Sequence, residues 1–276
     1  MTVNKNSVMM RELERCRELV DVRLGEHFSE DVSYKTLLES MRYSLLSGGK
    51  RIRALLCLNF CAAVGGDLDA ALDAACAIEM LHTYSLIHDD LPCMDDDDMR
   101  RGKPSNHIKY GECTAVLAGD ALQAAAFETV LKSNLPPERV VAMARVLAEA
   151  AGPHGICGGQ HLDIFGDGKT VEALSEIHKL KTAALFVASA KLGVYAGGGS
   201  SEQLTAAVEY ASALGLAFQV RDDVLDDTAL AAILGREESA RLIREETEKA
   251  VSAIDGKFED AEFLVWLAQL LQDREV

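Results

Sequence analysis

The sequence predicts an all-α fold, and two features of its pattern carry this prediction. Apolar residues recur with a helical period through most of the chain, and no segment shows the alternation of a convincing strand. The five prolines and the glycine-rich breaks fall between these periodic segments. Because no linker rich in Gly, Ser or Pro divides the chain, we expect one domain over residues 1–276. The prediction is a single-domain bundle of about ten or more helices around a central apolar cavity.

Two of the expected helices, Leu68–Asp90 and the part Leu214–Asp226 of another, lack a polar face and end in carboxylates. A helix that is apolar nearly all round is buried within a bundle. Each would bring charge to the end of a dry cavity, which suits a substrate with a hydrocarbon tail and a diphosphate head. The full set of expected helices is Ser7–Leu24, Val32–Leu46, Ile52–Val64, Leu68–Asp90, Ala115–Lys132, Pro136–Ala151, Val171–Tyr195, Ser201–Asp226, Leu230–Ile254 and Ala261–Gln272.

The composition limits the classes of partner. The net charge of −16 argues against nucleic acid and against anionic membranes. Ten of the 44 acidic residues lie in two clusters, and without them the net charge would be −6, so the excess acidity is local. The N-terminal stretch Met1–Asn6 lacks the apolar region of a signal peptide, and no apolar run reaches ~18 residues without charge. We therefore expect a cytoplasmic protein without stable membrane insertion.

The first acidic cluster follows an apolar run and is itself followed by two arginines. Its carboxylates are Asp89, Asp90 and Asp95–Asp98, and the arginines are Arg100 and Arg101. Mg²⁺ takes one or two protein carboxylates and fills its sphere with water and substrate phosphate, while guanidinium groups clamp phosphate. A solvated acidic loop or a loose Ca²⁺ site is the alternative. Pro92 should end the helix at about Asp90–Leu91, so that Asp95 can return toward Asp89.

The second acidic cluster closes another apolar segment. Asp222 and Asp226 lie four residues apart on a helix and share a face, as do Asp223 and Asp226 at a spacing of three. Like charges at this spacing are destabilising unless something neutralises them. The two clusters together predict two walls of one metal–diphosphate site.

Other polar residues interrupt apolar or glycine-rich surroundings. Lys50 and Arg53 follow Gly48-Gly49 where a helix begins, which is typical of a phosphate site, although exposed basic residues after a helix end would look the same. His82 is either a ligand-binding group or a satisfied core histidine. The remaining candidates are Lys181 and Thr182, which interrupt an apolar helix, and Gln219, which stands beside the second acidic cluster.

From about Tyr43 onward the chain resembles the trans-isoprenyl (polyprenyl) diphosphate synthases. The motifs that carry the resemblance are Gly48-Gly49-Lys50-Arg51-Ile52-Arg53, Asp89-Asp90-x4-Asp95 with Arg100-Arg101-Gly102, Gly158-Gly159-Gln160-x2-Asp163, Lys181-Thr182 and Phe218-Gln219-x2-Asp222-Asp223-x2-Asp226. The resemblance implies an all-α bundle, usually a homodimer, that joins isopentenyl diphosphate to an allylic diphosphate. It also implies Mg²⁺ as cofactor, with about three ions per active site when substrate is bound and Mn²⁺ as a substitute.

The resemblance assigns roles residue by residue. The implied Mg²⁺ ligands are Asp89, Asp95 and Asp222, supported by Asp90, Asp223 and Asp226. The implied isopentenyl diphosphate site consists of Lys50, Arg53, His82 and Arg101. The implied allylic site, which also carries the catalytic groups, consists of Arg100, Lys181, Thr182 and Gln219.

The implied product is farnesyl diphosphate. In the family, a bulky residue about one helical turn before the first motif stops chain growth, and here Tyr84 stands there with Ser85 beside it. Together with the Asp89-Asp90-x4-Asp95 spacing, this is most similar to bacterial-type farnesyl diphosphate synthases. Geranylgeranyl diphosphate is the alternative product, and Tyr84 packing only in the core is the alternative role.

One departure from the family follows the second motif. In the family, a loop after the second motif reaches the allylic diphosphate, and on the order of 20 of its residues have no counterpart after Asp227. Because active-site lids are often mobile, we expect that this loop is a mobile lid left out of this sequence. Three other functions stay open. A class I terpene cyclase would not need the Lys50, Arg53 and His82 site, a non-catalytic subunit would not need two intact Asp motifs, and an acidic Ca²⁺-binding scaffold would not need cations beside both clusters.

Overall fold

The computed structural model describes residues 5–166, 168 and 170–274, and its regular structure is almost entirely α-helical. The all-α prediction is confirmed. Contacts between Cα atoms divide the chain into two compact units, Met1–Leu55 with Leu72–Asn134 and Leu56–Ala71 with Leu135–Val276. The single domain over residues 1–276 stays a prediction. Residues 1–4, on which part of the compartment prediction rests, lie outside the described residues.

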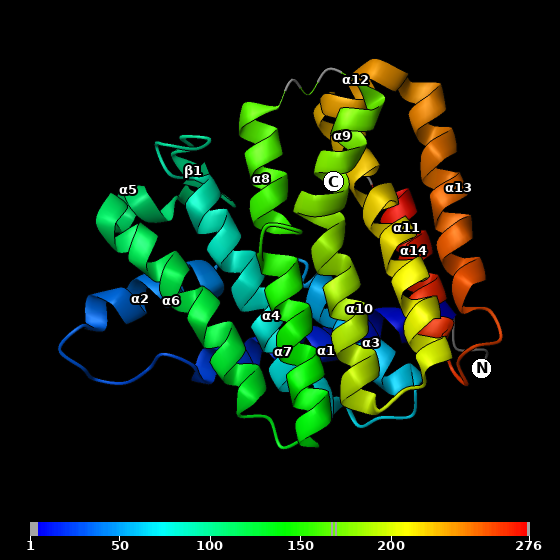
Figure 1. Ribbon diagram of the computed structural model, residues 1–276, viewed down its shortest axis with the longest axis horizontal. Coiled ribbons are helices and arrows are strands. Elements are labelled where there is room, and N and C mark those ends of the chain that lie inside the picture. The colour runs from blue at the N-terminus through cyan, green and yellow to red at the C-terminus, as the bar shows by residue number, and fades with distance from the viewer. Residues whose placement is uncertain (1–4, 167, 169, 275–276) are drawn as a thin grey trace. The chain divides into compact units, whose positions relative to one another are not determined.

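The first unit is built from helices and one small hairpin. Its elements are α1 (Lys5–Glu26), α2 (Lys35–Leu45), β1 (Met99–Arg100), β2 (Lys103–Pro104), α5 (Asn106–Tyr110) and α6 (Glu112–Leu131), and α3 (Ile52–Ala63) and α4 (Leu68–Asp89) contribute residues to both units. Helices α2 and α5 both pack against α6 (Figure 1). The core of this unit is aliphatic, with Leu24, Leu45, Ile78 and Leu81 fully buried.

The second unit contains α7 (Pro137–Ala151), α8 (Ile156–Phe165), α9 (Val171–Ile177), the π-helical turn η1 (His178–Ala183), α10 (Ala184–Gly197), α11 (Ser201–Asp226), α12 (Ala229–Leu234), α13 (Arg236–Ile254) and α14 (Glu262–Asp273). Figure 1 shows α10 between α7 and α11, with α13 against α11. A cluster of buried apolar side chains joins α9, α11, α12 and α13: Leu174, Ile177, Val220, Leu230 and Ile243.

The structure differs from the sequence-based expectation at short elements and breaks. The hairpin of β1 and β2 was not expected, because two-residue strands are too short to show an alternating pattern. The expected helix Leu230–Ile254 is divided at Gly235, whose φ of 79° ends α12. Helices α5 and α8 were also missed, since α5 has five residues and α8 contains a glycine pair that disfavours helix.

A helix that crosses a bilayer needs about 20 consecutive, predominantly apolar residues. None of the helices in residues 5–166, 168 and 170–274 is both long enough and apolar enough to cross a membrane.

A close approach of α8 to η1 explains one glycine of α8. A Cβ atom added at Gly159 would lie 2.3 Å from the backbone nitrogen of Lys181. Because backbone cannot move aside as a flexible side chain can, only glycine fits there. This contact holds the glycine-rich helix against the turn that carries Lys181 and Thr182.

We expect Gly159→Ala to lower the free energy of unfolding by about 1–3 kcal/mol, because the added methyl group overpacks the contact with η1. Gly25→Ala is the matched control, since Gly25 lies in α1 with no atom within 4 Å of the added Cβ. Alanine should stabilise that helix by about 0.5–1 kcal/mol. Thermal and urea unfolding would measure the stability of both variants. Equal changes in the free energy of unfolding at the two sites would contradict the conclusion that the backbone of Lys181 excludes a side chain at position 159.

Candidate active site

The first acidic motif begins where α4 ends. Helix α4 stops at Asp89, just before Pro92, as expected. The chain then turns back, and the backbone N–H of Asp95 donates to the carbonyl oxygen of Asp89 at 2.9 Å. Asp95 therefore returns to Asp89 as the position of Pro92 predicted, and two carboxylate-bearing residues share one turn.

A hairpin carries the two arginines that follow. Arg101 and Gly102 form its two-residue turn, with φ of 53° and 73°, and type I′ turns require positive φ at both positions. Arg100 Nε donates to Asp90 Oδ1 at 2.8 Å. Burial raises the pKa of Asp90, which is only 2% exposed, and Arg100 opposes that shift. Arg100 is thus bound to the second aspartate of the doublet.

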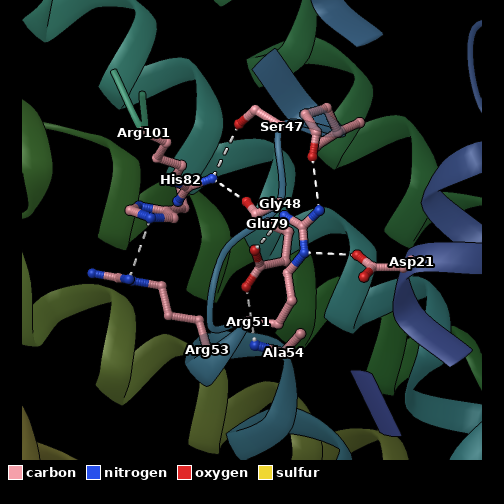
Figure 2. A network of polar contacts seen from close by, with 10 residues as sticks. Asp21, Ser47, Gly48, Arg51, Arg53, Ala54, Glu79, His82 and Arg101 are labelled. Carbon is pink, nitrogen blue, oxygen red and sulfur yellow. Dashed lines mark hydrogen bonds and ion pairs between the residues drawn. The ribbon is translucent and has the colours of Figure 1, made fainter. Parts of the chain in front are cut away.

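Arg53, His82 and Arg101 lie beside the loop that precedes α3 (Figure 2). The Arg101 guanidinium donates to Ser47 Oγ at 3.3 Å and to the Gly48 carbonyl oxygen. Arg53 Nη1 lies 3.5 Å from His82 Nε2, and since arginine only donates, the histidine nitrogen accepts. Burial lowers the pKa of His82 well below its ordinary value, and Arg53 and Arg101 lower it further, so this imidazole is neutral at pH 7.

The second unit joins three of the sequence motifs. Lys181 Nζ, on η1, forms an ion pair with Asp163 Oδ2 on α8 at 2.6 Å. Thr182 Oγ1 donates to Gln219 Oε1 at 2.8 Å, and Gln219 Nε2 donates to Asp223 Oδ1 at 3.0 Å. The two oxygens expected beside the allylic group, those of Thr182 and Gln219, are therefore neighbours. The role of Asp163 as partner of Lys181 was not assigned from sequence.

The two aspartates of the second doublet have different surroundings. Asp223 is 3% exposed, and its Oδ2 accepts the backbone N–H of Leu230 at 3.0 Å. Asp222 Oδ1 is bound by the guanidinium of Arg274, which also stacks on the Phe218 ring with its carbon 4.0 Å from the ring centre. Sequence reasoning missed Arg274, because nothing in the pattern links the C-terminal segment to α11.

The connection after the second motif is short. Asp227 and Thr228 alone separate α11 from α12, and Thr228 N donates to the Asp223 carbonyl oxygen at 2.9 Å. Asp227 and Ala229 both have positive φ, of 57° and 42°, which is costly for residues other than glycine. The chain turns tightly at the point where the resemblance predicted a longer loop.

The expected chain-length residues lie on α4, before the first motif. Tyr84 is 4% exposed, and its ring packs edge-on against His88 with centroids 5.8 Å apart. Ser85 Oγ donates to the His82 carbonyl oxygen at 2.9 Å. Burial is required of a pocket floor and equally of a core residue, so both roles of Tyr84 stay open here.

A cavity of about 520 Å³ in the second unit lies beside η1, α10 and α11, with Leu180, Ala184, Val187 and Leu216 among its lining residues. The expected allylic-site residues Lys181, Thr182 and Gln219 do not line it. The predicted substrate pocket is therefore not identified by this cavity.

The donor atoms suit a hard divalent cation that also binds substrate. Asp89 and Asp95 offer carboxylate oxygens on one turn, which matches the one or two protein ligands that Mg²⁺ takes. Within the part of the chain that the structure describes, no group of three or more His, Cys, Asp and Glu side chains could hold an ion. Any Mg²⁺ at these residues would depend on other oxygens, such as those of a diphosphate.

Acidification should destabilise the protein through its buried histidines. Burial lowers the pKa of His27, His82 and His178 below 6.5, so these groups take up protons more readily when unfolded. The contribution of these histidines to the free energy of unfolding is complete well above pH 6.5. It declines as the pH falls below 6.5, by at most about 1.4 kcal/mol per pH unit for each group. Urea unfolding between pH 7.5 and 5.5 measures this. His82→Gln should reduce the dependence of the free energy of unfolding on pH. An unchanged dependence would contradict the conclusion that His82 is neutral in the folded protein.

Comparison with known proteins agrees with these motifs. A family model described as polyprenyl synthetase matches residues 34–240. The chain is 53% identical over 209 residues to geranylgeranyl pyrophosphate synthase 3, chloroplastic, of Arabidopsis thaliana, which covers 73% of this chain and 58% of that protein. It is 49% identical to geranylgeranyl pyrophosphate synthase, chloroplastic, of Capsicum annuum, covering 76% of this chain and again 58% of the relative. The chain thus spans less than two thirds of these relatives.

Solved structures cover nearly the whole chain. An FPP/GFPP synthase from Zymomonas mobilis is 33% identical, with a TM-score of 0.91 over 96% of this chain and 99% of that one. A geranyltransferase from Legionella pneumophila is 34% identical, with a TM-score of 0.92 over 98% of this chain and 99% of its own. Both the family match and these similarities lead to the same conclusion: the chain belongs to the polyprenyl synthetase family and has its all-α isoprenoid synthase fold.

Proposed function

We propose that this protein is a chain-elongating prenyltransferase that condenses isopentenyl diphosphate with the allylic diphosphates dimethylallyl and geranyl diphosphate. The observation that carries the proposal is the turn that brings Asp95 back to Asp89, next to the hairpin of Arg100 and Arg101. Carboxylates and guanidinium groups at one chain turn are what a metal-bound diphosphate requires. The basic group of Lys50, Arg53 and Arg101 supports a second diphosphate site, which a terpene cyclase would not use.

The proposed residues act by binding and by stabilising charge. Lys181 and Arg100 would stabilise the negative charge that builds on the allylic diphosphate as its carbon–oxygen bond breaks. The adjacent oxygens of Thr182 and Gln219 would face the allylic cation. The double bond of isopentenyl diphosphate then attacks this cation, and the proton lost afterwards passes to the departed diphosphate. The reaction needs no side-chain nucleophile.

Mg²⁺ is the proposed cofactor, with about three ions when substrate is bound and Mn²⁺ as a substitute. When bound, it would neutralise the leaving diphosphate as a Lewis acid. Asp89 and Asp95 would hold it at the first motif, and Asp222 at the second. Asp222 Oδ1 is already bound by Arg274, so a metal ion there would share this carboxylate with the guanidinium or displace it.

Farnesyl diphosphate is the proposed product, supported by the buried, bulky Tyr84 one turn before Asp89. Geranylgeranyl diphosphate is a second candidate, because the curated relatives at about half identity are named geranylgeranyl pyrophosphate synthases. The two products differ by one condensation step. The same chemistry makes both, and the depth of the pocket would decide which one is released.

Two further parts of the proposal concern assembly and location. We propose a homodimer, supported by apolar side chains that are exposed on helices of each unit, such as Val116 and Leu117 on α6 and Val141 on α7. The cytoplasm stays the predicted compartment. The curated relatives are named chloroplastic, which is a property of those proteins.

The test of function is an incubation with Mg²⁺, isopentenyl diphosphate and dimethylallyl diphosphate, with products resolved by carbon number. We expect a fifteen-carbon product, whereas a twenty-carbon product would favour the second candidate. Asp89→Ala should lower turnover at least ~10²-fold, the usual scale for losing one electrostatic contact in the transition state. Asp31→Ala, at an exposed loop position, is the matched control. Near-normal turnover of Asp89→Ala would rule out its role as a metal ligand.

Tyr84→Ala tests the pocket floor. Removing the ring should lengthen the main product by at least one five-carbon unit, because the growing chain could extend past position 84. Tyr84→Phe keeps the bulk and should leave the product unchanged. Product length is read by chromatography, and thermal unfolding verifies that each variant is folded. An unchanged product from folded Tyr84→Ala would remove Tyr84 from the chain-length role.

A further inference from the structure

Arg51 is unusual for a residue between two candidate phosphate-binding cations. It is only 4% exposed, and its φ of 52° lies in the left-handed region that residues other than glycine seldom adopt. Such a conformation is strained and persists only where the surroundings enforce it. The contacts of the Arg51 side chain provide that enforcement.

Three separate segments hold the Arg51 guanidinium (Figure 2). Its Nε donates to Asp21 Oδ1 on α1 at 2.9 Å, and its Nη1 donates to Glu79 Oε2 on α4 at 3.1 Å. Its Nη2 donates to the carbonyl oxygen of Leu45, the last residue of α2, at 2.8 Å. One side chain thus ties α1, α2 and α4 to the loop that contains Lys50.

Glu79 completes the arrangement from the other side. Its side chain is 3% exposed, and its second oxygen, Oε1, accepts the backbone N–H of Ala54 at 3.3 Å in the first turn of α3. The carboxylate therefore binds both the side chain of the loop and the N-terminal end of the next helix. A buried ion pair with every polar atom engaged is geometrically demanding, and loss of either partner leaves an uncompensated charge.

The pair lies between the groups proposed to bind isopentenyl diphosphate. Arg51 stands between Lys50 and Arg53 in sequence, and Glu79 precedes His82 by one helical turn on α4. His82 in turn lies 3.5 Å from Arg53. The bond from Arg51 to Glu79 consequently joins the loop that carries Lys50 to the helix that carries the imidazole of His82.

Arg51 and Arg101 differ in how the protein compensates their charges. Burial disfavours the charged guanidinium, yet Glu79 and Asp21 outweigh burial and raise the pKa of Arg51. Its charge is neutralised inside the protein. Arg101 differs, because burial and the nearby Arg51 lower its pKa, so an anion there would relieve it.

We propose that Arg51 and Glu79 are a positioning pair that sets the affinity of the isopentenyl diphosphate site without touching the substrate. This inference rests on the proposed function. A residue that acts in this way should affect one substrate and spare the other, whereas a merely structural pair would affect both alike.

The experiment compares Arg51→Met, Glu79→Gln and the double variant Arg51→Met/Glu79→Met with the natural chain. KM is measured separately for isopentenyl and dimethylallyl diphosphate, and calorimetry measures binding of isopentenyl diphosphate and of inorganic pyrophosphate without an allylic partner. Supporting residues of a site typically contribute 10–100-fold. We expect the isopentenyl diphosphate KM to rise at least ~10-fold, with the dimethylallyl diphosphate KM within about twofold.

The double variant keeps the proposal testable if single variants fail to fold, because replacing a buried pair with apolar residues is often neutral for stability. Arg51→Lys should restore part of the isopentenyl diphosphate affinity that Arg51→Met loses, since a single ammonium group cannot bind all three partners. Arg23→Gln is the matched control, because Arg23 also joins α1 to α4, through Asp73 at 2.7 Å, away from the loop.

Two outcomes would overturn the inference while the proposed function stands: unchanged isopentenyl diphosphate affinity in the folded double variant, or an equal rise in both KM values. A natural chain that performs no condensation but whose pyrophosphate binding is weakened by these substitutions would contradict the function alone. A natural chain that binds neither isopentenyl diphosphate nor pyrophosphate would overturn both.

Discussion

The loop that carries Lys50 is held by one buried ion pair, between Arg51 and Glu79. Three helices meet this pair, and the loop it fixes holds a residue in a left-handed conformation that the chain would otherwise avoid. Four basic groups gather around one histidine in this unit, and they would repel one another. Glu79 and Asp21 supply internal counter-charge to Arg51, and Asp90 supplies it to Arg100.

In both acidic motifs the two aspartates of the doublet differ in burial, which the sequence does not reveal. In each doublet the second aspartate is buried and bound by the protein: Asp90 by Arg100, and Asp223 by Gln219 and the amide of Leu230. The first aspartate, Asp89 or Asp222, is more exposed. A buried carboxylate with fixed partners anchors the backbone at each doublet.

Much of this could be predicted, because long helices follow from apolar periodicity and the end of α4 follows from Pro92. The return of Asp95 to Asp89 needed only the proline and the spacing. The partners of Arg51, Lys181 and Asp222 could not be predicted, since Glu79, Asp163 and Arg274 lie 18 to 52 residues away and pair only after folding. Glu79 did carry a signal, because an acid in an otherwise apolar helix needs a partner.

Asp89 is the last residue of α4, and Asp222, Asp223 and Asp226 lie in the last turns of α11, where the helix dipole places partial negative charge. Carboxylates there are disfavoured by the backbone itself as well as by one another. A protein selected only for durability would replace them with neutral or basic residues, and such replacements should raise its melting temperature. Their presence is therefore a thermodynamic cost, which Arg100 and Arg274 offset in part and a bound cation would reduce further.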